Sequence, residues 1–260
     1  MSRATMLDFE KELGRAVKHF WRIRGKQKNR QGTKTGQKDA GERGSVTGGK
    51  HADGFIRLIA AIVKDAALPN VDVHLTEKRP RTLPGFYRPC KEWDLVVLSG
   101  QSLVAVVEVK SQVGSFGNNF NNRVEEALGN ATDFWAAYRE GIFKLSQKPW
   151  LGYLFMLEER ETSVRGTKPI LLKPYAIDEA FQKRSYAKRY ELVCQRLVHD
   201  RLYDAACFFT SDATSGRKGQ YKEPNVELGI KNFAISLHAR AAAFARMGEE
   251  LKVLEAKSDE

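Results

Sequence analysis

Three side chains that could act together on a phosphate ester stand between residues 94 and 110. Asp94 comes immediately before one apolar run, and Glu108 and Lys110 end the next. Mg²⁺ binds one or two carboxylates and keeps water and a substrate phosphate as its other ligands. Charged groups at the end of an apolar strand are costly to bury unless something compensates them, and a divalent metal would do so. The pattern therefore predicts metal-dependent chemistry.

A β-hairpin is the element that would bring these side chains together. Two runs rich in Val and Leu, residues 95–98 and 103–107, are separated by a turn containing Gly100. Antiparallel pairing places the start of the first strand beside the end of the second, so we expect Asp94 near Glu108. The second run is apolar at every position, which is typical of a central strand buried on both faces.

The pattern of an acid two residues before a lysine is not diagnostic by itself. It occurs again at Glu250-Leu251-Lys252 and at Glu255-Ala256-Lys257, in a charged segment of helical character. A solvated helix face explains it there. Only the hairpin context, with an Asp placed to face the Glu, favours a metal site.

The composition favours a polyanionic partner. The chain has 260 residues, 42% of them hydrophobic, which suits one substantial α/β domain. Its net charge of +11 favours nucleic acid first and an anionic membrane surface second. We expect no membrane part, since no apolar run is long enough to span one and charges interrupt the N-terminal segment. With three cysteines that lack zinc-site spacing, we expect a cytoplasmic protein of bacterial type.

We divide this single domain, residues 1–260, into four parts. An N-terminal helix is expected over residues 1–21, a catalytic core over 51–180 and a mainly helical part over 181–260. Residues 22–50 are rich in glycine and basic residues, including Arg24, Lys26, Lys28 and Arg30. Either they form a solvated flexible loop, or they form a basic arm that orders on a phosphate backbone.

Strands and helices are expected to alternate around the hairpin. Strands are predicted at residues 71–75, 150–157 and, interrupted by Pro174, 170–176, and residues 205–209 are expected to form a strand or another buried segment. Helices are predicted at residues 53–67, 122–138 and 230–246. Asp53 is suited to cap the helix that it begins. Asn122 and Glu125 have the spacing of a capping box.

Several motifs carry a resemblance to a known family. The order of helix, strand, hairpin, helix and strand resembles the PD-(D/E)xK nuclease superfamily, although Trp93 replaces the usual Pro before the Asp. Closer similarity is to the XhoI-type restriction endonucleases, from about residue 44 to 197. It rests on Leu83-Pro84-Gly85-Phe86-Tyr87-Arg88-Pro89, Trp93-Asp94, Val107-Glu108-Val109-Lys110-Ser111, Ser115-Phe116-Gly117-Asn118-Asn119-Phe120-Asn121-Asn122-Arg123, Gly48-Gly49, Asp53-Gly54-Phe55, Ser185-Tyr186, Arg189-Tyr190-Glu191 and Cys194.

The resemblance implies a restriction-endonuclease-like fold, a central mixed sheet flanked by helices. It also implies a homodimeric type II enzyme that uses Mg²⁺ to cut double-stranded DNA at CTCGAG, leaving 5′ overhangs, while a paired methyltransferase protects host DNA. In this interpretation Asp94 and Glu108 hold the metal, and the carbonyl of Val109 could add a ligand. Lys110 would position or help deprotonate the attacking water. Asp53 is either a third acid or only a helix cap.

The asparagine-rich segment is the candidate for reading bases. It contains Asn118, Asn119, Asn121, Asn122 and Arg123. Asn pairs with adenine and Arg with guanine in the major groove. A polar loop that caps a helix would explain Asn122 without any such contact.

Three other functions remain open from the sequence. The first is a DNA repair or recombination nuclease that is selective for structure. The second is a non-catalytic DNA-binding protein, which the intact Asp94, Glu108 and Lys110 disfavour. The third is a His-based nuclease, which the scattered positions of the five histidines disfavour.

Overall fold

The apolar run of residues 103–107 lies in the central strand of the molecule. The structure is a computed structural model that describes residues 8–32, 51–66, 71–74, 81–143 and 147–258. The run belongs to β5 (Ser102–Gln112), which pairs antiparallel with β4 (Leu95–Ser99). Leu95 stands opposite Val107, and Gly100 in the connecting turn has a φ of +57°, which glycine adopts without strain. The predicted hairpin is confirmed.

β5 is the middle strand of a five-stranded mixed sheet with the order β1–β4–β5–β6–β7. β1 (Val71–His74) runs antiparallel to β4, whereas β6 (Trp150–Glu158) and β7 (Ala205–Ser211) continue the sheet in parallel. Every residue of β6 and β7 is buried, as expected for parallel strands covered on both faces. The strands predicted at residues 71–75, of which 71–74 are described, and at 150–157 are confirmed, and of the two alternatives for residues 205–209 the strand is correct.

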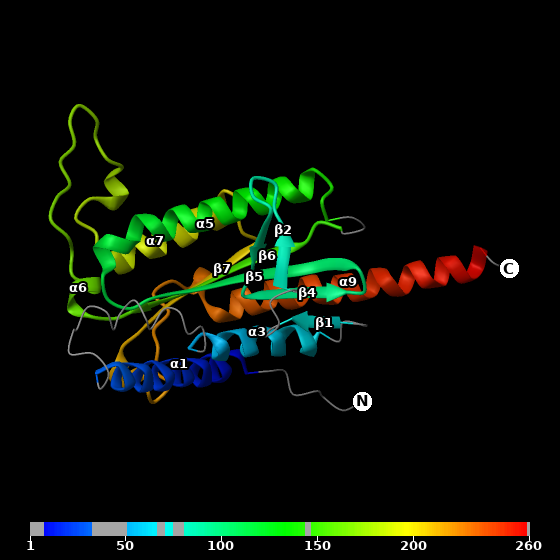
Figure 1. Cartoon of the computed structure of the whole chain (residues 1–260), viewed down its shortest axis with the longest axis horizontal. Coiled ribbons are helices and arrows are strands. Elements are labelled where there is room, and N and C mark those ends of the chain that lie inside the picture. Colours follow the sequence, from blue (N-terminus) through cyan, green and yellow to red (C-terminus); the bar gives the residue numbers. More distant parts are fainter. Residues whose placement is uncertain (1–7, 33–50, 67–70, 75–80, 144–146, 259–260) are drawn as a thin grey trace.

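Helices cover both faces of this sheet (Figure 1). One face carries α5 (Phe116–Arg139) and α7 (Tyr186–His199), and the other carries α1 (Phe9–Gly32), α3 (Asp53–Asp65) and α9 (Ile230–Ser258). Side chains alternate along β4, so Val97 packs in the core with α1 and α3, and Val96 packs with α5 and α7. The expected α+β architecture, a mixed sheet flanked by helices, is confirmed.

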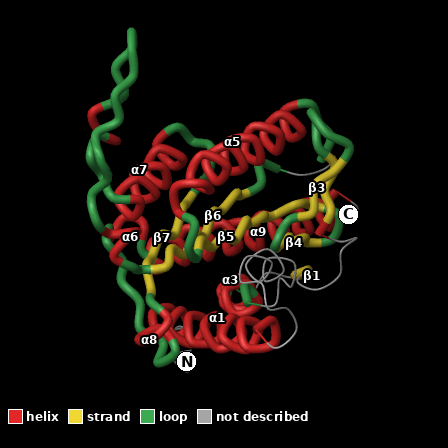
Figure 2. Tube along the Cα trace, turned by 60° about the vertical axis from the view of Figure 1, so that its left-hand side comes forward, coloured by secondary structure: helices red, strands yellow, loops and turns green. Residues whose placement is uncertain are grey.

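Shorter elements fill the connections. β2 (Thr82–Pro84) and β3 (Cys90–Glu92) form a separate antiparallel ribbon, and the remaining short helices are α6 (Glu161–Val164), η1 (Glu179–Phe181), α8 (Ala213–Gly216) and η2 (Val226–Leu228). The connection between α6 and α7 extends away from the sheet as a long loop (Figures 1 and 2). Among the described residues, no helix has the length and apolarity needed to cross a membrane.

Residues 22–32 differ from the prediction of a flexible arm, because α1 continues to Gly32. The helix is anchored in the core by Leu13, Val17 and Phe20, which are fully buried. The arginine, lysine and glutamine residues that follow are good helix formers, and extending an anchored helix costs little. The remainder of the predicted arm, residues 33–50, lies outside the described residues.

Two other predictions are wrong. Residues 170–176 form no strand, since Pro174 has no N–H to donate to a sheet and the neighbouring Leu171 is exposed. The helix expected from Asn122 begins at Phe116, so Asn122 and Glu125 lie inside α5 and cannot form a capping box. Phe116 is buried against the core, and this packing begins the helix earlier than the polar pattern indicated.

Candidate active site

Asp94 is fixed at the open end of the β4–β5 hairpin. It precedes β4, and its Oδ2 atom accepts a hydrogen bond of 2.8 Å from the backbone N–H of Val109 in β5. This bond holds the carboxylate beside β5, just beyond the last pair between the two strands, Leu95 and Val107. Burial and, after it, the nearby Glu108 carboxylate raise the pKa of Asp94 to about 6, because the neighbouring lysines and the Val109 N–H offset them only in part.

Glu108 is a buried carboxylate with a cation at each oxygen. Its residue is 1% exposed. The Nζ atom of Lys110 lies 2.5 Å from Oε1, and the Nζ atom of Lys91 lies 3.1 Å from Oε2. Burial alone would raise the pKa of Glu108, but the two ammonium groups outweigh it and lower that pKa.

Lys110 completes the group that the hairpin was expected to assemble. Burial opposes its charge, but Glu108 and Asp94 raise its pKa, so it stays an ammonium. The structure thus brings Asp94, Glu108 and Lys110 together on the face of the sheet that α5 covers. Both carboxylates therefore stand near the ammonium of Lys110, at the point of β5 where its pairing with β4 ends, an arrangement suited to binding a metal and a phosphate.

Two members of the cluster were not identified from the sequence. Lys91 reaches Glu108 from β3, and its ammonium lies 4.5 Å from the centre of the Trp93 ring. Asn130, which is buried on α5, donates a long hydrogen bond of 3.4 Å to Oε1 of Glu108. A signal for Asn130 was present: it is a polar residue among Ala127, Ala131 and Phe134 on the apolar face of a predicted helix.

The donor set suits a hard divalent metal. Within the described ranges, no group of three or more His, Cys, Asp or Glu side chains is placed to bind a metal ion. Asp94 and Glu108 offer carboxylate oxygens instead, and Mg²⁺ commonly takes one or two of these and keeps several waters. The two lysines around the buried Glu108 show that this point of the structure requires positive charge.

The asparagine-rich segment forms the first turns of α5, directly after β5. Asn118, Asn121 and Asn122 are exposed and lie on one helix face, because they are three and four residues apart. Asn119 instead donates a hydrogen bond of 3.0 Å to the carbonyl of Ser115. Arg123 pairs with Glu126 at 2.5 Å. Three amides of the segment are therefore presented to solvent together.

A tight turn between β5 and α5 positions this face. Gly114 and Ser115 have φ values of +68° and +46°, in the left-handed region that turns the chain sharply. The buried carboxylate of Glu158 accepts a hydrogen bond of 3.0 Å from the N–H of Gly114. The start of α5 is consequently fixed relative to the ends of β5 and β6.

The remaining predicted residues lie elsewhere. Asp53 is the first residue of α3, after the cap position at Ala52, so it is not the N-cap. α3 packs on the other face of the sheet, and no contact found for Asp53 in the described part of the chain reaches Asp94 or Glu108. Arg24 lies on α1, where its charge acts on His51 and Glu158. Lys26, Lys28 and Arg30 follow on the same helix.

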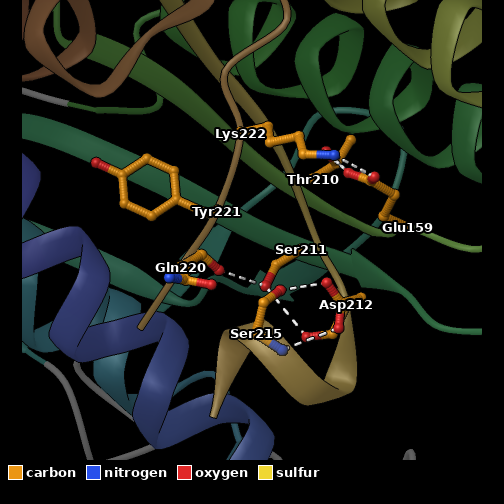
Figure 3. A pocket seen from close by; sticks show the side chains of 8 residues that line it. All are labelled: Glu159, Thr210, Ser211, Asp212, Ser215, Gln220, Tyr221 and Lys222. Carbon is orange, nitrogen blue, oxygen red and sulfur yellow. Dashed lines mark hydrogen bonds and ion pairs between the residues drawn. The ribbon is translucent and has the colours of Figure 1, made fainter. Parts of the chain in front are cut away.

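A hollow at the ends of β6 and β7 is lined mainly by polar side chains that bind one another (Figure 3). Lys222 and Thr210 both contact Glu159, and Ser211 donates to the carbonyl of Gln220. Asp212 accepts from the backbone of Thr214 and Ser215, at the start of α8. These polar groups pair with one another and hold the loop after β7 in place.

This fold and this cluster define a class of protein, the metal-dependent nucleases with a restriction-endonuclease-like core. The family model of restriction endonuclease XhoI matches residues 30–223, a wider range than the motifs had indicated. The chain belongs to the XhoI restriction endonuclease family. It is accordingly a type II restriction endonuclease, a site-specific deoxyribonuclease of a restriction–modification system, and this assignment displaces the three other functions considered above.

Individual relatives support the family. The chain is 45% identical over 218 residues to the type II restriction enzyme BstVI of Geobacillus stearothermophilus, across 81% of this chain and 95% of the relative. It is 45% identical over 162 residues to XhoI of Xanthomonas vasicola, across 61% and 64% of the two chains. It is 44% identical over 160 residues to AbrI of Azospirillum brasilense, across 61% and 70%. No solved structure matches the chain significantly.

Proposed function

We propose that this chain cuts both strands of duplex DNA at the palindrome CTCGAG, with Mg²⁺ as its metal, and leaves 5′ overhangs. The observation that carries the proposal is the convergence of Asp94, Glu108 and Lys110 at one end of the hairpin, in a chain of this family. Enzymes of this class generally use a divalent metal. The choice of palindrome follows from the resemblance to the XhoI-type enzymes.

Asp94 and Glu108 would hold the metal, and the carbonyl of Val109 would add a ligand. A bound Mg²⁺ supplies stabilisation of charge on the phosphate and lowers the pKa of water. Lys110, which stays an ammonium, would position the attacking water and stabilise the charge that develops on the phosphate. Asp53 has no part in this proposal, because the contacts described for it do not join the cluster.

DNA recognition would use two surfaces, the start of α5 and the basic segment of α1. The exposed amides of Asn118, Asn121 and Asn122 would contact base edges, and Asn119 would support the turn that presents them. Arg123 would exchange its contact with Glu126 for a base or a phosphate. The cations of α1, namely Arg24, Lys26, Lys28 and Arg30, would contact phosphates, which position a protein on DNA without reading sequence.

A palindrome cut on both strands requires two symmetric copies of the site, so we propose a homodimer. The paired methyltransferase would protect the same sequence in host DNA and need not bind this chain. The cytoplasm of a bacterial-type cell is where such an enzyme meets its DNA, and we propose that compartment.

One experiment tests the proposal directly. Purified protein is incubated with a CTCGAG duplex and with duplexes that each carry one changed base pair, in Mg²⁺ or in EDTA, and the ends are sequenced. We expect double-strand cleavage of CTCGAG in Mg²⁺ alone. Equal cleavage of every duplex, or a preference for branched or flapped DNA, would instead indicate a nuclease that reads DNA structure.

A further inference from the structure

Two large aromatic side chains are exposed at the tip of the β2–β3 ribbon. Phe86 is 47% exposed and Tyr87 is 71% exposed, and their rings meet edge to face at 4.9 Å. Neither side chain belongs to the apolar clusters on the two faces of the sheet. Neighbouring exposed aromatic rings often mark a binding surface, because their apolar area is costly to leave in water.

The turn that carries these rings is held rigidly by α5. The backbone N–H groups of Phe86 and Tyr87 both donate to Oδ1 of Asp133, at 2.9 and 2.7 Å. The Nε atom of Arg88 donates to Oδ2 of the same carboxylate at 2.8 Å. A side chain at Gly85 would lie 2.6 Å from Asp133 Oδ2 and 2.7 Å from the carbonyl of Arg88, so the turn packs too closely for any other residue.

The same network reaches the carboxylate that would bind the metal. Arg88 donates through Nη2 to Asn130 Oδ1 at 3.0 Å, and Asn130 donates to Glu108 Oε1 at 3.4 Å. Lys91, in β3 of the same ribbon, contacts the other oxygen of Glu108. The aromatic pair is therefore connected to the catalytic cluster by two separate paths, through α5 and through β3.

We propose that the Phe86–Tyr87 turn is a contact for duplex DNA beside the scissile phosphate, where its rings pack against bases or sugars. This inference rests on the proposed DNA substrate. Aromatic rings pack on bases of any sequence, and apolar side chains enter the minor groove between base steps. The rigid connection to Glu108 favours DNA as the occupant, because DNA bound at the turn must be aligned with the reacting phosphate. A second protein chain would not need this connection.

The variants Phe86→Ala and Tyr87→Ala, singly and together, test the turn, and Tyr87→Phe retains the ring. Val226→Ala in η2 is the matched control, since Val226 is an exposed apolar residue that is 83% accessible. Binding of metal-free protein to a CTCGAG duplex and to an unrelated duplex is measured by fluorescence anisotropy. Thermal unfolding and sedimentation of each variant show whether its fold and its association state are unchanged.

We expect each alanine variant to bind both duplexes roughly five- to a hundredfold more weakly, the effect typical of losing one aromatic contact to a base. Tyr87→Phe and Val226→Ala should bind like the wild type, and all variants should unfold at the wild-type temperature. Duplex binding by the double variant at the wild-type level would overturn the proposal. Loss of self-association with unchanged DNA binding would also overturn it, because the turn would then be a protein interface.

DNA binding by the Phe86 and Tyr87 variants and cleavage of CTCGAG by the wild type are measured independently, so either can fail without the other. If the wild type binds duplex DNA but does not cut CTCGAG, the assigned palindrome fails. The binding difference between wild type and the double variant still decides whether Phe86 and Tyr87 touch DNA.

Discussion

The ammonium of Lys91 lies 3.1 Å from Oε2 of Glu108, while the other oxygen of that carboxylate faces Lys110. Lys91 belongs to the β2–β3 ribbon and is supported by the ring of Trp93. Trp93 stands where the wider superfamily has Pro, and here its ring packs between Lys91 and Phe134. The two ammonium groups thus occupy both oxygens of Glu108, and we expect Lys91 to compete with a metal for this carboxylate.

Removing the charge of Lys91 should therefore strengthen metal binding. We expect Lys91→Met to bind Mg²⁺ roughly tenfold more tightly in the absence of DNA, because nearby like charges in partly buried surroundings repel by about 1 kcal/mol or more. Calorimetric titration of the free protein with Mg²⁺ measures the change. Lys148→Met is the control, since Lys148 also lies over a tryptophan ring and pairs with an acid, Asp204, without contacting Glu108. Equal or weaker affinity in Lys91→Met would show that Lys91 does not compete with the metal.

Substitution of the three cluster residues should abolish cleavage without abolishing DNA binding. We expect Asp94→Asn, Glu108→Gln and Lys110→Met each to lower the cleavage rate of a CTCGAG duplex by at least about a hundredfold, the usual effect of removing one charge-stabilising group. Asp53→Asn is the matched control, because Asp53 stands apart from the cluster on α3. Single-turnover cleavage and anisotropy on the same samples separate chemistry from binding. Near-normal cleavage by either carboxylate variant would remove the metal-site assignment.

The raised pKa of Asp94 predicts a pH dependence of metal binding. Burial raises this pKa from 3.8 to about 6, so below pH 6 a metal must displace a proton from Asp94. Glu108 stays ionised in this range because its pKa is lowered. We expect the apparent Mg²⁺ affinity to fall about tenfold per pH unit below pH 6 and to level off above it. Calorimetry between pH 5 and pH 8 measures this, and an affinity that does not vary with pH would contradict it.

The hairpin could be predicted because everything that specifies it is local. The two Val- and Leu-rich runs, the glycine turn and the two-residue period place Asp94, Glu108 and Lys110 without reference to any other segment. Lys91 and Asn130 approach Glu108 from a separate ribbon and from α5, so their contacts depend on how distant elements pack. Sequence periodicity carries no information about such packing.

The errors at α5 and at residues 170–176 have the same origin. Polar residues in the first turns of α5 suggested a loop, but the burial of Phe116 begins the helix earlier. Leu171 and Leu172 suggested a strand, yet the segment leaves the sheet and both side chains are exposed. In each case tertiary packing, or its absence, outweighed the local pattern.

The exposed face of α5 should determine specificity. We expect Asn118→Ala, Asn121→Ala and Asn122→Ala each to lower cleavage of CTCGAG by roughly ten- to a hundredfold, the value of one bidentate base contact of about 1–3 kcal/mol. Binding to unrelated DNA should change little, because phosphate contacts supply that affinity. Asn119→Ala is the comparison within the segment, since its amide is occupied by Ser115. If Asn119→Ala alters site preference more than the other three, the amides on the exposed face are not the ones that read bases.

Because α1 continues to Gly32, the basic segment is helical, and its contribution to DNA binding can be measured from the salt dependence of the affinity. Arg24, Lys26, Lys28 and Arg30 lie on one continuous helix, so phosphate contacts by several of them should be released together when they are replaced. Each phosphate contact contributes about 0.9 to the slope of log affinity against log salt concentration. Replacing all four residues with Gln should flatten that slope by up to about three to four units and weaken binding to all duplexes alike.

The control replaces Lys222 and Lys231 with Gln, because these lysines are exposed but paired with Glu159 and Glu10. Anisotropy titrations between 50 and 300 mM salt on CTCGAG and on an unrelated duplex provide the slopes. A slope that matches the wild type would show that these four cations do not contact DNA, and a loss confined to CTCGAG would show that they contact bases.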